Sequence, residues 1–316
     1  MTNNIQKAIT EIRGILPQES ILINEPMSAH TSFRIGGPAD ALVIAGSEDE
    51  LAGVLKILQK FKDEGKDVPY ILIGNGSNFL VSDEGYPGIM IRLGGEFDSI
   101  EQDPEDRTLV RAGAAKLLSG TSVFLTEKGL AGFEFASGIP GSIGGAVFMN
   151  AGAYGGEMKD IVVSVRLMKE DGSGTVELSG QEMDFGYRHS IVEEGGLIVC
   201  SALLKLTEDY PDAIAERVRE LQNKRNAKQP VNYPSAGSTF KRPVGGFAAA
   251  LIDQAGLKGY RVGGAEVSEK HAGFVINRGG ATAEDVLAVM RHVRSVVLEN
   301  SGIELEPEVR LINCSL

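Results

Sequence analysis

The chain has 316 residues, of which 42% are hydrophobic and 23% are charged, and its formal net charge is −12. This length exceeds one ordinary core and predicts two domains, while the negative charge argues against a nucleic-acid partner. No apolar run approaches the roughly 18 residues that a bilayer-spanning helix needs, so no membrane insertion is expected. Cys200 and Cys314 form no CxxC motif, which favours the reducing cytoplasm.

Strand and helix signals alternate along the first two thirds of the chain. Apolar residues at helical spacing predict an amphipathic helix over residues 1–16. Ser47 is a predicted N-cap, and Glu50 stands at the position that completes a capping box. The other predicted elements here are strands at 41–45, 69–73 and 89–93, a helix at about 115–128, and strands from about 161 to 207 with a hairpin turn at EDGSG.

The character of the chain changes at Pro211, where a charged amphipathic helix begins. We therefore place a domain boundary just before this residue. A shorter helix with a glycine stop follows in GFAAALIDQAGLKG, then strands near 260–277. Thr282 and Asp285 predict a capped helix that ends near Asn300, and the tail IELEPEVRLI alternates like a strand.

Two glycine-rich loops are the main candidates for a binding site. The first, ILIGNGSNFLVSD, spans residues 71–83, and its glycines would let backbone N–H groups approach a phosphate. Ser77 and Asn78 add side-chain donors. The loop is no Walker motif, because no GK[ST] follows, and Phe79 replaces the third glycine of a Rossmann fingerprint. A glycine-rich turn between two strands is the alternative.

The second loop, SGIPGSIGGAVFMNAGAYGG at residues 137–156, contains seven glycines. Ordering each glycine costs roughly 0.5–1 kcal/mol relative to alanine within regular structure, so a purely structural segment would gain little from so many. A loop against a flat cofactor and its diphosphate would gain backbone donors and steric clearance. The alternative is a tight, buried crossing of glycines.

Six motifs in the expected order give the chain a family resemblance. TSFRIGGPAD, IGNGSNFLVSDEGYPG, SGIPGSIGGAVFMNAGAYG, FGYRHS, YPSAGSTFKRP and LEPEVRLI together resemble the UDP-N-acetylenolpyruvoylglucosamine reductase family over nearly the whole chain. The resemblance implies an α+β fold with an FAD-binding domain of the vanillyl-alcohol-oxidase-like type. That domain has two α/β subdomains and spans residues 1–207, with 303–316 returning as a strand. A smaller α/β substrate domain spans 208–302.

The resemblance also implies the reaction. Non-covalently bound FAD takes a hydride from NADPH and passes it to the enolpyruvyl double bond of UDP-N-acetylglucosamine enolpyruvate. The product, UDP-N-acetylmuramate, serves peptidoglycan precursor synthesis for the cell wall. The implied FAD-binding residues are Arg34, Gly74, Asn75, Gly76, Ser77, Asn78, Ser137, Gly138, Ile139, Pro140, Gly141, Ser142, Gly145, Ala151 and Gly152.

Three catalytic residues are carried over from the family. Arg188 would stabilise the negative charge that develops at the substrate carboxylate, since a guanidinium stays charged and binds carboxylates bidentately. Ser238 would donate the proton, and Glu308 would donate a hydrogen bond or orient a water. The structural alternatives are a surface arginine or an Asp184 pair for Arg188, a turn residue for Ser238, and a surface pair with Arg310 for Glu308.

The substrate diphosphate needs cations and hydrogen-bond donors. Lys228, Lys241 and Arg242 are the candidates, and Tyr187 would stack or hydrogen-bond in the site. Lysine near a helix C-terminus is also favourable without any ligand. Tyr187 could equally be a half-buried strand aromatic.

The chain resembles the family subgroup that lacks an extra tyrosine-bearing loop, because HSIVEEGGLIVC passes directly into a predicted strand. One rival function is an FAD-linked oxidase of the same flavin fold, although no histidine lies between Gly74 and Phe79 to hold flavin covalently. His30 is the only histidine near the start of that domain. A non-catalytic nucleotide-binding regulator is the other rival. The histidines show no metal-ligand spacing, so no metal is expected, and a monomer or weak oligomer is expected.

Overall fold

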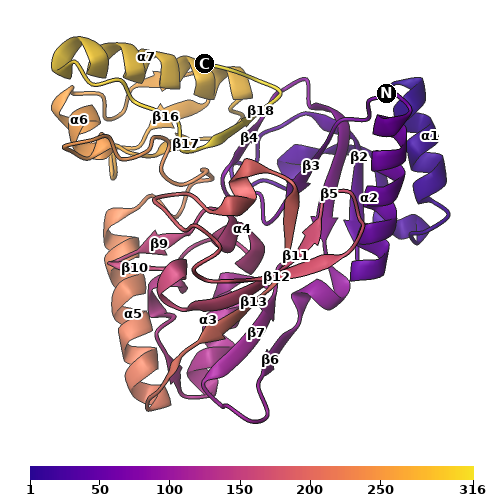
Figure 1. Ribbon diagram of the computed structural model, residues 1–316. Helices are drawn as coiled ribbons and strands as arrows, with labels where there is room; N and C mark the ends of the chain where they lie inside the picture. Colours follow the sequence, from indigo (N-terminus) through magenta and orange to yellow (C-terminus); the bar gives the residue numbers. More distant parts are fainter. The chain divides into compact units, whose positions relative to one another are not determined.

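The computed structural model covers residues 1–316. The chain forms two compact units, which are described separately (Figure 1). Unit 1 comprises Met1–Leu22, Ala41–Asn75 and Gly88–Lys224, and unit 2 comprises Ile23–Asp40, Gly76–Pro87 and Arg225–Leu316. The sequence-based division of functional domains at 207/208 stays a prediction.

The helices and strands follow a mixed α/β order. The α-helices are α1 (Asn3–Ile12), α2 (Glu48–Asp63), α3 (Leu118–Glu127), α4 (Ile143–Phe148), α5 (Pro211–Lys228), α6 (Ala248–Gln254) and α7 (Ala283–Ser301). The strands are β1 (Ile21–Pro26), β2 (Pro38–Ala45), β3 (Tyr70–Ile73), β4 (Phe79–Val81), β5 (Tyr86–Leu93), β6 (Ile100–Gln102), β7 (Leu109–Gly113), β8 (Leu130–Ala131), β9 (Gly152–Ala153), β10 (Gly156–Glu157), β11 (Val162–Lys169), β12 (Thr175–Ser179), β13 (Leu197–Lys205), β14 (Thr207–Glu208), β15 (Arg261–Val262), β16 (Ala265–Val267), β17 (Val275–Asn277) and β18 (Arg310–Ile312). The short 3-10 turns include η4 (Glu134–Ala136) and η6 (Ile191–Glu194).

Unit 1 contains two hydrophobic cores. In the first, α1 and α2 lie side by side and pack with apolar residues of the sheet β1-β2-β5-β3, in which β3 and β5 are parallel (Figure 1). The second core lies against the sheet β12-β11-β13-β7-β6, whose neighbouring strands are antiparallel, and includes residues of α3 and α4. These two cores match the predicted pair of α/β subdomains.

Unit 2 has a third core. Helix α7 lies along the antiparallel sheet β15-β16-β17 (Figure 1). The buried valines of this helix belong to the third core. Strand β18 pairs in parallel with β4, so the end of the chain joins the strand in the second half of the first glycine loop.

Most predicted elements are confirmed, with two corrections. Thr282 and Asp285 form the predicted capping box, and Ser47 Oγ accepts the Glu50 N–H at 3.2 Å. The Glu50 carboxylate, however, accepts the N–H of Gly46 at 2.6 Å, so the predicted reciprocal bond to Ser47 is wrong. The predicted tail strand is also too long, because only Arg310–Ile312 is a strand.

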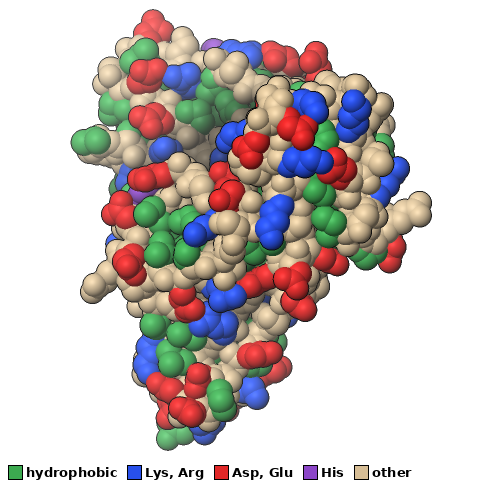
Figure 2. All heavy atoms as spheres, turned by 45° about the vertical axis from the view of Figure 1, so that its right-hand side comes forward, with side chains coloured by type: hydrophobic (Ala, Val, Ile, Leu, Met, Phe, Trp, Pro, Cys, Tyr) green, Lys and Arg blue, Asp and Glu red, His purple; other side chains and the backbone are tan.

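Figure 2 shows acidic and basic side chains interspersed over the visible face, without a single-sign field. None of the helices combines the length and the apolar character that a bilayer-spanning segment needs.

Candidate functional site

The two glycine-rich loops meet within unit 1. Gly74 follows β3, and a Cβ built on it would lie 3.0 Å from the Ser142 Oγ of the second loop. That spacing is tighter than most Cβ contacts, so a glycine at 74 lets the two loops approach closely. The structure thus brings together one residue from each predicted FAD-binding segment.

The second loop presents backbone donors that the chain itself does not use. The N–H groups of Gly138, Gly141 and Ser142 donate to no acceptor within the chain. Ser142 is only 4% exposed, and buried N–H groups without a partner are rare in folded proteins. These donors fit a ligand rich in acceptor oxygens, such as the diphosphate of FAD.

The first N–H groups of helix α4 already have acceptors within the chain. The N–H groups of Ile143 and Gly144 donate to the carbonyls of Lys116 and Ala114. The Gly145 N–H points to its N-cap, Ser142 Oγ, at 3.5 Å. The free donors therefore belong to the loop before the helix rather than to the helix itself.

The remainder of the first loop belongs to unit 2, as does Arg34. Gly76 has a φ of +61°, and a Cβ there would lie 1.9 Å from the His30 carbonyl oxygen. Only glycine fits this position. Arg34 also has a left-handed backbone, with a φ of +55°.

Asn78 has a role that the sequence did not reveal. Its side-chain amide donates to the carbonyl oxygen of Glu308 at 3.1 Å, and its own carbonyl accepts the Arg310 N–H at 2.9 Å. One of the donors predicted for a phosphate is thus directed at the backbone of a predicted catalytic residue.

Glu308 and Ser238 lie on neighbouring segments of unit 2. The Glu308 N–H donates to the carbonyl of Thr239 at 2.8 Å, and Phe240 forms a bridge with Pro307. Thr239 is buried, whereas Ser238 is partly exposed, so Thr239 anchors the segment and Ser238 faces outward from it.

In unit 1, buried polar side chains position the loop that carries Arg188. Asn150 is 1% exposed, and its amide donates to the Gly186 carbonyl at 2.9 Å and to the Glu157 carboxylate at 3.0 Å. Ser190 Oγ donates to the carbonyl of Phe148 at the end of α4. The Arg188 loop is therefore joined to the second half of the second glycine loop.

Arg188 itself has a φ of +55°, and its guanidinium carbon lies 5.2 Å from the centre of the exposed Tyr187 ring. The pKa of Glu157 is lowered, chiefly by its hydrogen bond to Lys159, with further contributions from Asn150 and the Arg188 charge. A carboxylate therefore lies within electrostatic reach of Arg188. Neither Glu157 nor Asn150 was a sequence candidate.

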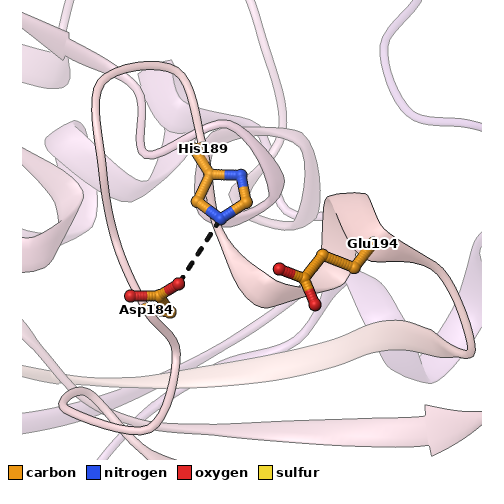
Figure 3. Close-up of side chains that lie close together, drawn as sticks. All are labelled: Asp184, His189 and Glu194. Atoms are coloured by element: carbon orange, nitrogen blue, oxygen red, sulfur yellow. Dashed lines mark ion pairs between the residues drawn. The ribbon is translucent and has the colours of Figure 1, made fainter.

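An ion-pair cluster lies next to Arg188 in the sequence (Figure 3). His189 lies 3.1 Å from the Glu193 carboxylate and 3.7 Å from that of Asp184, and the hydrogen bond to Glu193 raises the pKa of His189. Ligand atoms of Asp184, His189 and Glu194 lie within 4.8 Å of one another, a grouping that sequence spacing did not predict. The carboxylates of Asp184 and Glu194 are both exposed. We therefore describe the contacts of His189 as ion pairs and assign no metal to this group.

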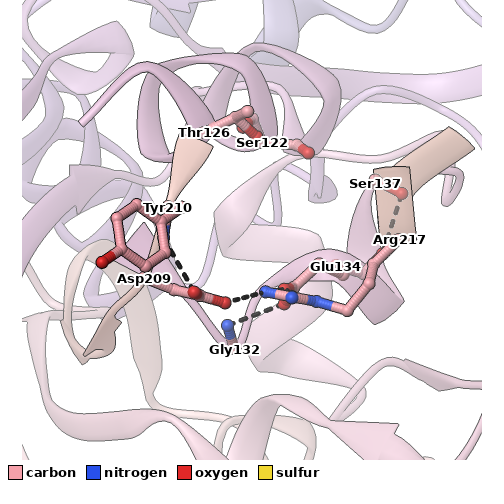
Figure 4. Close-up of polar contacts among 8 residues, drawn as sticks. All are labelled: Ser122, Thr126, Gly132, Glu134, Ser137, Asp209, Tyr210 and Arg217. Carbon is pink, nitrogen blue, oxygen red and sulfur yellow. Dashed lines mark hydrogen bonds and ion pairs between the residues drawn. The ribbon is translucent and has the colours of Figure 1, made fainter. Parts of the chain in front are cut away.

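A second polar network supports the start of the second glycine loop (Figure 4). The Glu134 carboxylate accepts the Gly132 N–H at 2.7 Å and pairs with Arg217 of α5, which also binds Asp209. Ser137 Oγ donates to the Glu134 carbonyl at 2.8 Å, so this network fixes the first predicted residue of the loop.

The predicted diphosphate ligands have partners of their own. Lys241 lies 3.8 Å from Glu306, and the Arg242 guanidinium lies 4.4 Å from the centre of the Phe247 ring. Lys228 is exposed at the C-terminal end of α5. The Lys241–Glu306 pair is exposed, and exposed ion pairs contribute little to stability.

Comparisons with known proteins agree with this description. A family model for the C-terminal domain of UDP-N-acetylenolpyruvoylglucosamine reductase matches residues 229–312, and an FAD binding domain model matches residues 39–177. The UDP-N-acetylenolpyruvoylglucosamine reductase of Clostridioides difficile (strain 630) is 48% identical over 98% of this chain and 99% of its own. That of Agathobacter rectalis is 47% identical over 99% of both chains.

Solved structures give the same assignment. The reductase from Thermus caldophilus is 36% identical with a TM-score of 0.76, covering 92% of this chain and 98% of its own. p-Cresol methylhydroxylase, at 14% identity and a TM-score of 0.50 over 97% of this chain and 66% of its own, shares the fold alone. The chain therefore belongs to the UDP-N-acetylenolpyruvoylglucosamine reductase family.

Proposed function

We propose that the glycine loops hold FAD and that Arg188, Ser238 and Glu308 carry out the reduction of the enolpyruvyl double bond of UDP-N-acetylglucosamine enolpyruvate. The chain is an FAD-dependent, NADPH-using reductase of peptidoglycan precursor synthesis. The observation that most supports these residue roles is the backbone pairing of Glu308 with Thr239, which places a carboxyl group and the Ser238 hydroxyl on adjacent segments.

When bound, FAD accepts a hydride from NADPH and supplies it to the substrate. The remaining chemistry falls to the protein. Hydride addition to the far carbon of the vinyl ether pushes negative charge into the substrate carboxylate, and the Arg188 guanidinium stabilises that charge. Ser238 Oγ then gives its proton to the adjacent carbon, which the strongly basic enolate makes feasible. Glu308 donates a hydrogen bond when protonated or orients a water.

In this proposal the substrate diphosphate is bound by Lys228, Lys241 and Arg242, and Tyr187 stacks or hydrogen-bonds in the site. The diphosphate is covered without the extra tyrosine loop, because only the short turn η6 separates His189 from β13. The next tyrosine along the chain, Tyr210, lies at the start of α5 and is exposed. We therefore place the chain in the subgroup without that loop. We also propose that it works in the cytoplasm as a monomer or weak oligomer.

The test is Ser238→Ala, with the two half-reactions measured separately in a stopped-flow spectrometer. We expect the oxidation of reduced flavin by substrate to slow by roughly 10²–10⁴-fold, while reduction by NADPH stays nearly unchanged. Ser301→Ala is the matched control, because its hydroxyl bonds only to the end of α7 and the turn after it. Equal losses in both half-reactions would show that Ser238 has a structural role.

The rival oxidase makes a different prediction. Its reduced flavin would be reoxidised by oxygen and not by the enolpyruvate substrate, and a covalent adduct would stay with the protein after acid precipitation. His30, the candidate for such an adduct, is paired with Glu25 at 2.7 Å through its Nε2 atom. We expect acid to release all of the FAD.

A further inference from the structure

Thr239 joins three segments of unit 2. It is 5% exposed, and its N–H donates to the Gly273 carbonyl at 2.8 Å. Its Oγ1 accepts the N–H of Val275, the first residue of β17, at 3.0 Å. Its carbonyl oxygen accepts the Glu308 N–H at 2.8 Å. Backbone and hydroxyl together therefore fix this residue against β17 on one side and the Glu308 segment on the other.

The neighbours of Thr239 are the two proposed proton-handling residues. Ser238 precedes it in the chain, and Glu308 is bonded to its carbonyl. On the far side of Glu308, the Asn78 amide holds the Glu308 carbonyl at 3.1 Å. Because Ser238 directly precedes Thr239 and the Glu308 N–H is bonded to the Thr239 carbonyl, the position of Thr239 influences the positions of both residues.

We propose that Thr239 is a positioning residue for proton delivery, acting through the bond of its hydroxyl to the Val275 N–H. This proposal rests on the proposed roles of Ser238 and Glu308. Without the hydroxyl acceptor, the segment loses its bond to the first residue of β17. It keeps the backbone bonds of Thr239 to Gly273 and Glu308 and, further upstream, the bond from the Asn277 N–H to the Pro234 carbonyl. Misplacement of reacting groups by about 1 Å can slow a reaction by about 10²-fold, so even a partial release is measurable.

The experiment compares two substitutions at this position. Thr239→Val keeps the shape of the side chain but removes the acceptor, and Thr239→Ser keeps the hydroxyl. Thr282→Val is the matched control, because Thr282 Oγ1 also accepts a backbone N–H, that of Asp285 at 3.0 Å, at the start of α7. Each FAD-loaded variant is tested for flavin reduction by NADPH and for reoxidation by substrate.

For Thr239→Val we expect reoxidation by substrate to slow by about 10- to 100-fold, with flavin reduction by NADPH changed by less than about two-fold. Thr239→Ser should restore most of the rate, and Thr282→Val should leave both steps close to the parent protein while lowering stability. If Thr239→Val does not fold, Thr239→Cys takes its place, because a thiol is a weaker acceptor of similar size.

Three results would overturn the positioning role: equal slowing of both half-reactions, no slowing beyond that of Thr282→Val, or failure of Thr239→Ser to recover the rate. Ser238→Ala is measured in parallel. If it is impaired while Thr239→Val is not, only the positioning role fails. If Ser238→Ala leaves substrate reduction unchanged, the proposed function of Ser238 fails first.

Discussion

Asn150 offers a sharp test of how the Arg188 loop is held. Its amide donates to the Gly186 carbonyl and the Glu157 carboxylate, and its Oδ1 accepts the Lys159 N–H at 2.9 Å. Asn150→Asp keeps the acceptor but replaces both donors with a carboxylate. The change therefore removes the attachment to Gly186 and places two carboxylates in contact.

The expected loss of stability follows from the distance between the two carboxylates. Two unit charges 3.0 Å apart repel by roughly 5 kcal/mol at an effective dielectric constant of about 20. An unsatisfied buried partner adds about 1–3 kcal/mol. Protonation relieves part of the repulsion, and the proton goes to position 150, because Lys159 and Arg188 lower the pKa of Glu157. We expect the free energy of unfolding at neutral pH to fall by roughly 2–5 kcal/mol.

The stability of Asn150→Asp relative to the parent protein should depend on pH. The carboxyl introduced at position 150 has a higher pKa in the folded protein than in the unfolded chain, so the folded state binds more protons. Stability relative to the parent is then lost as the pH rises from about 4 through the folded pKa, and is regained in acid. Urea unfolding at several pH values measures this.

Asn277→Asp is the matched control, because Asn277 is also buried and its amide also donates to a backbone carbonyl, that of Phe33, but to no carboxylate. This variant loses the same kind of donor without placing two carboxylates in contact, so its stability should fall less at neutral pH than that of Asn150→Asp. Substrate reduction should slow in Asn150→Asp through the Arg188 loop. Unchanged stability together with unchanged substrate reduction in Asn150→Asp would refute the reasoning.

Three further predictions follow from single contacts. Gly76→Ala would place a Cβ 1.9 Å from the His30 carbonyl, so we expect weak FAD retention and about 1–3 kcal/mol lower stability, measured by flavin release and urea unfolding; unchanged retention would contradict this. Burial raises the pKa of Cys200 to about 12, so iodoacetamide at pH 8 should modify it only after unfolding, as mass spectrometry would show. The hydrogen bond to Glu193 raises the pKa of His189, so its ion pair stabilises the loop at low pH and is lost as the pH rises through the folded pKa. An NMR titration should give a raised midpoint that Glu193→Gln lowers, and a midpoint insensitive to Glu193→Gln would contradict this.

Local signals predicted much of the fold. A cap involves residues three positions apart, so Thr282 with Asp285, and Ser47 with the Glu50 N–H, were visible in the sequence. The apolar periodicity of α1 likewise placed Ile5, Ile9 and Ile12 in the core. The tail was predicted too long because alternation in IELEPEVRLI suggests a strand even where only part of the segment has a continuous partner strand.

The site was less accessible to sequence reasoning. Asn78 bonds to a residue 230 positions away, and no spacing rule reports such a contact. Asn150, Thr239 and Glu134 act by holding other groups in place, so their residue types alone carried no functional signal. The motif residues were predicted from the family resemblance, whereas the contacts that hold them in place were visible only in the structure.

The most direct test of the central claim is the visible spectrum of the FAD-loaded protein during anaerobic addition of NADPH and then of UDP-N-acetylglucosamine enolpyruvate. We predict a yellow protein that NADPH bleaches and that the substrate, without oxygen, recolours with one equivalent. A flavin that only oxygen reoxidises, or a protein that takes up no FAD, would contradict the account.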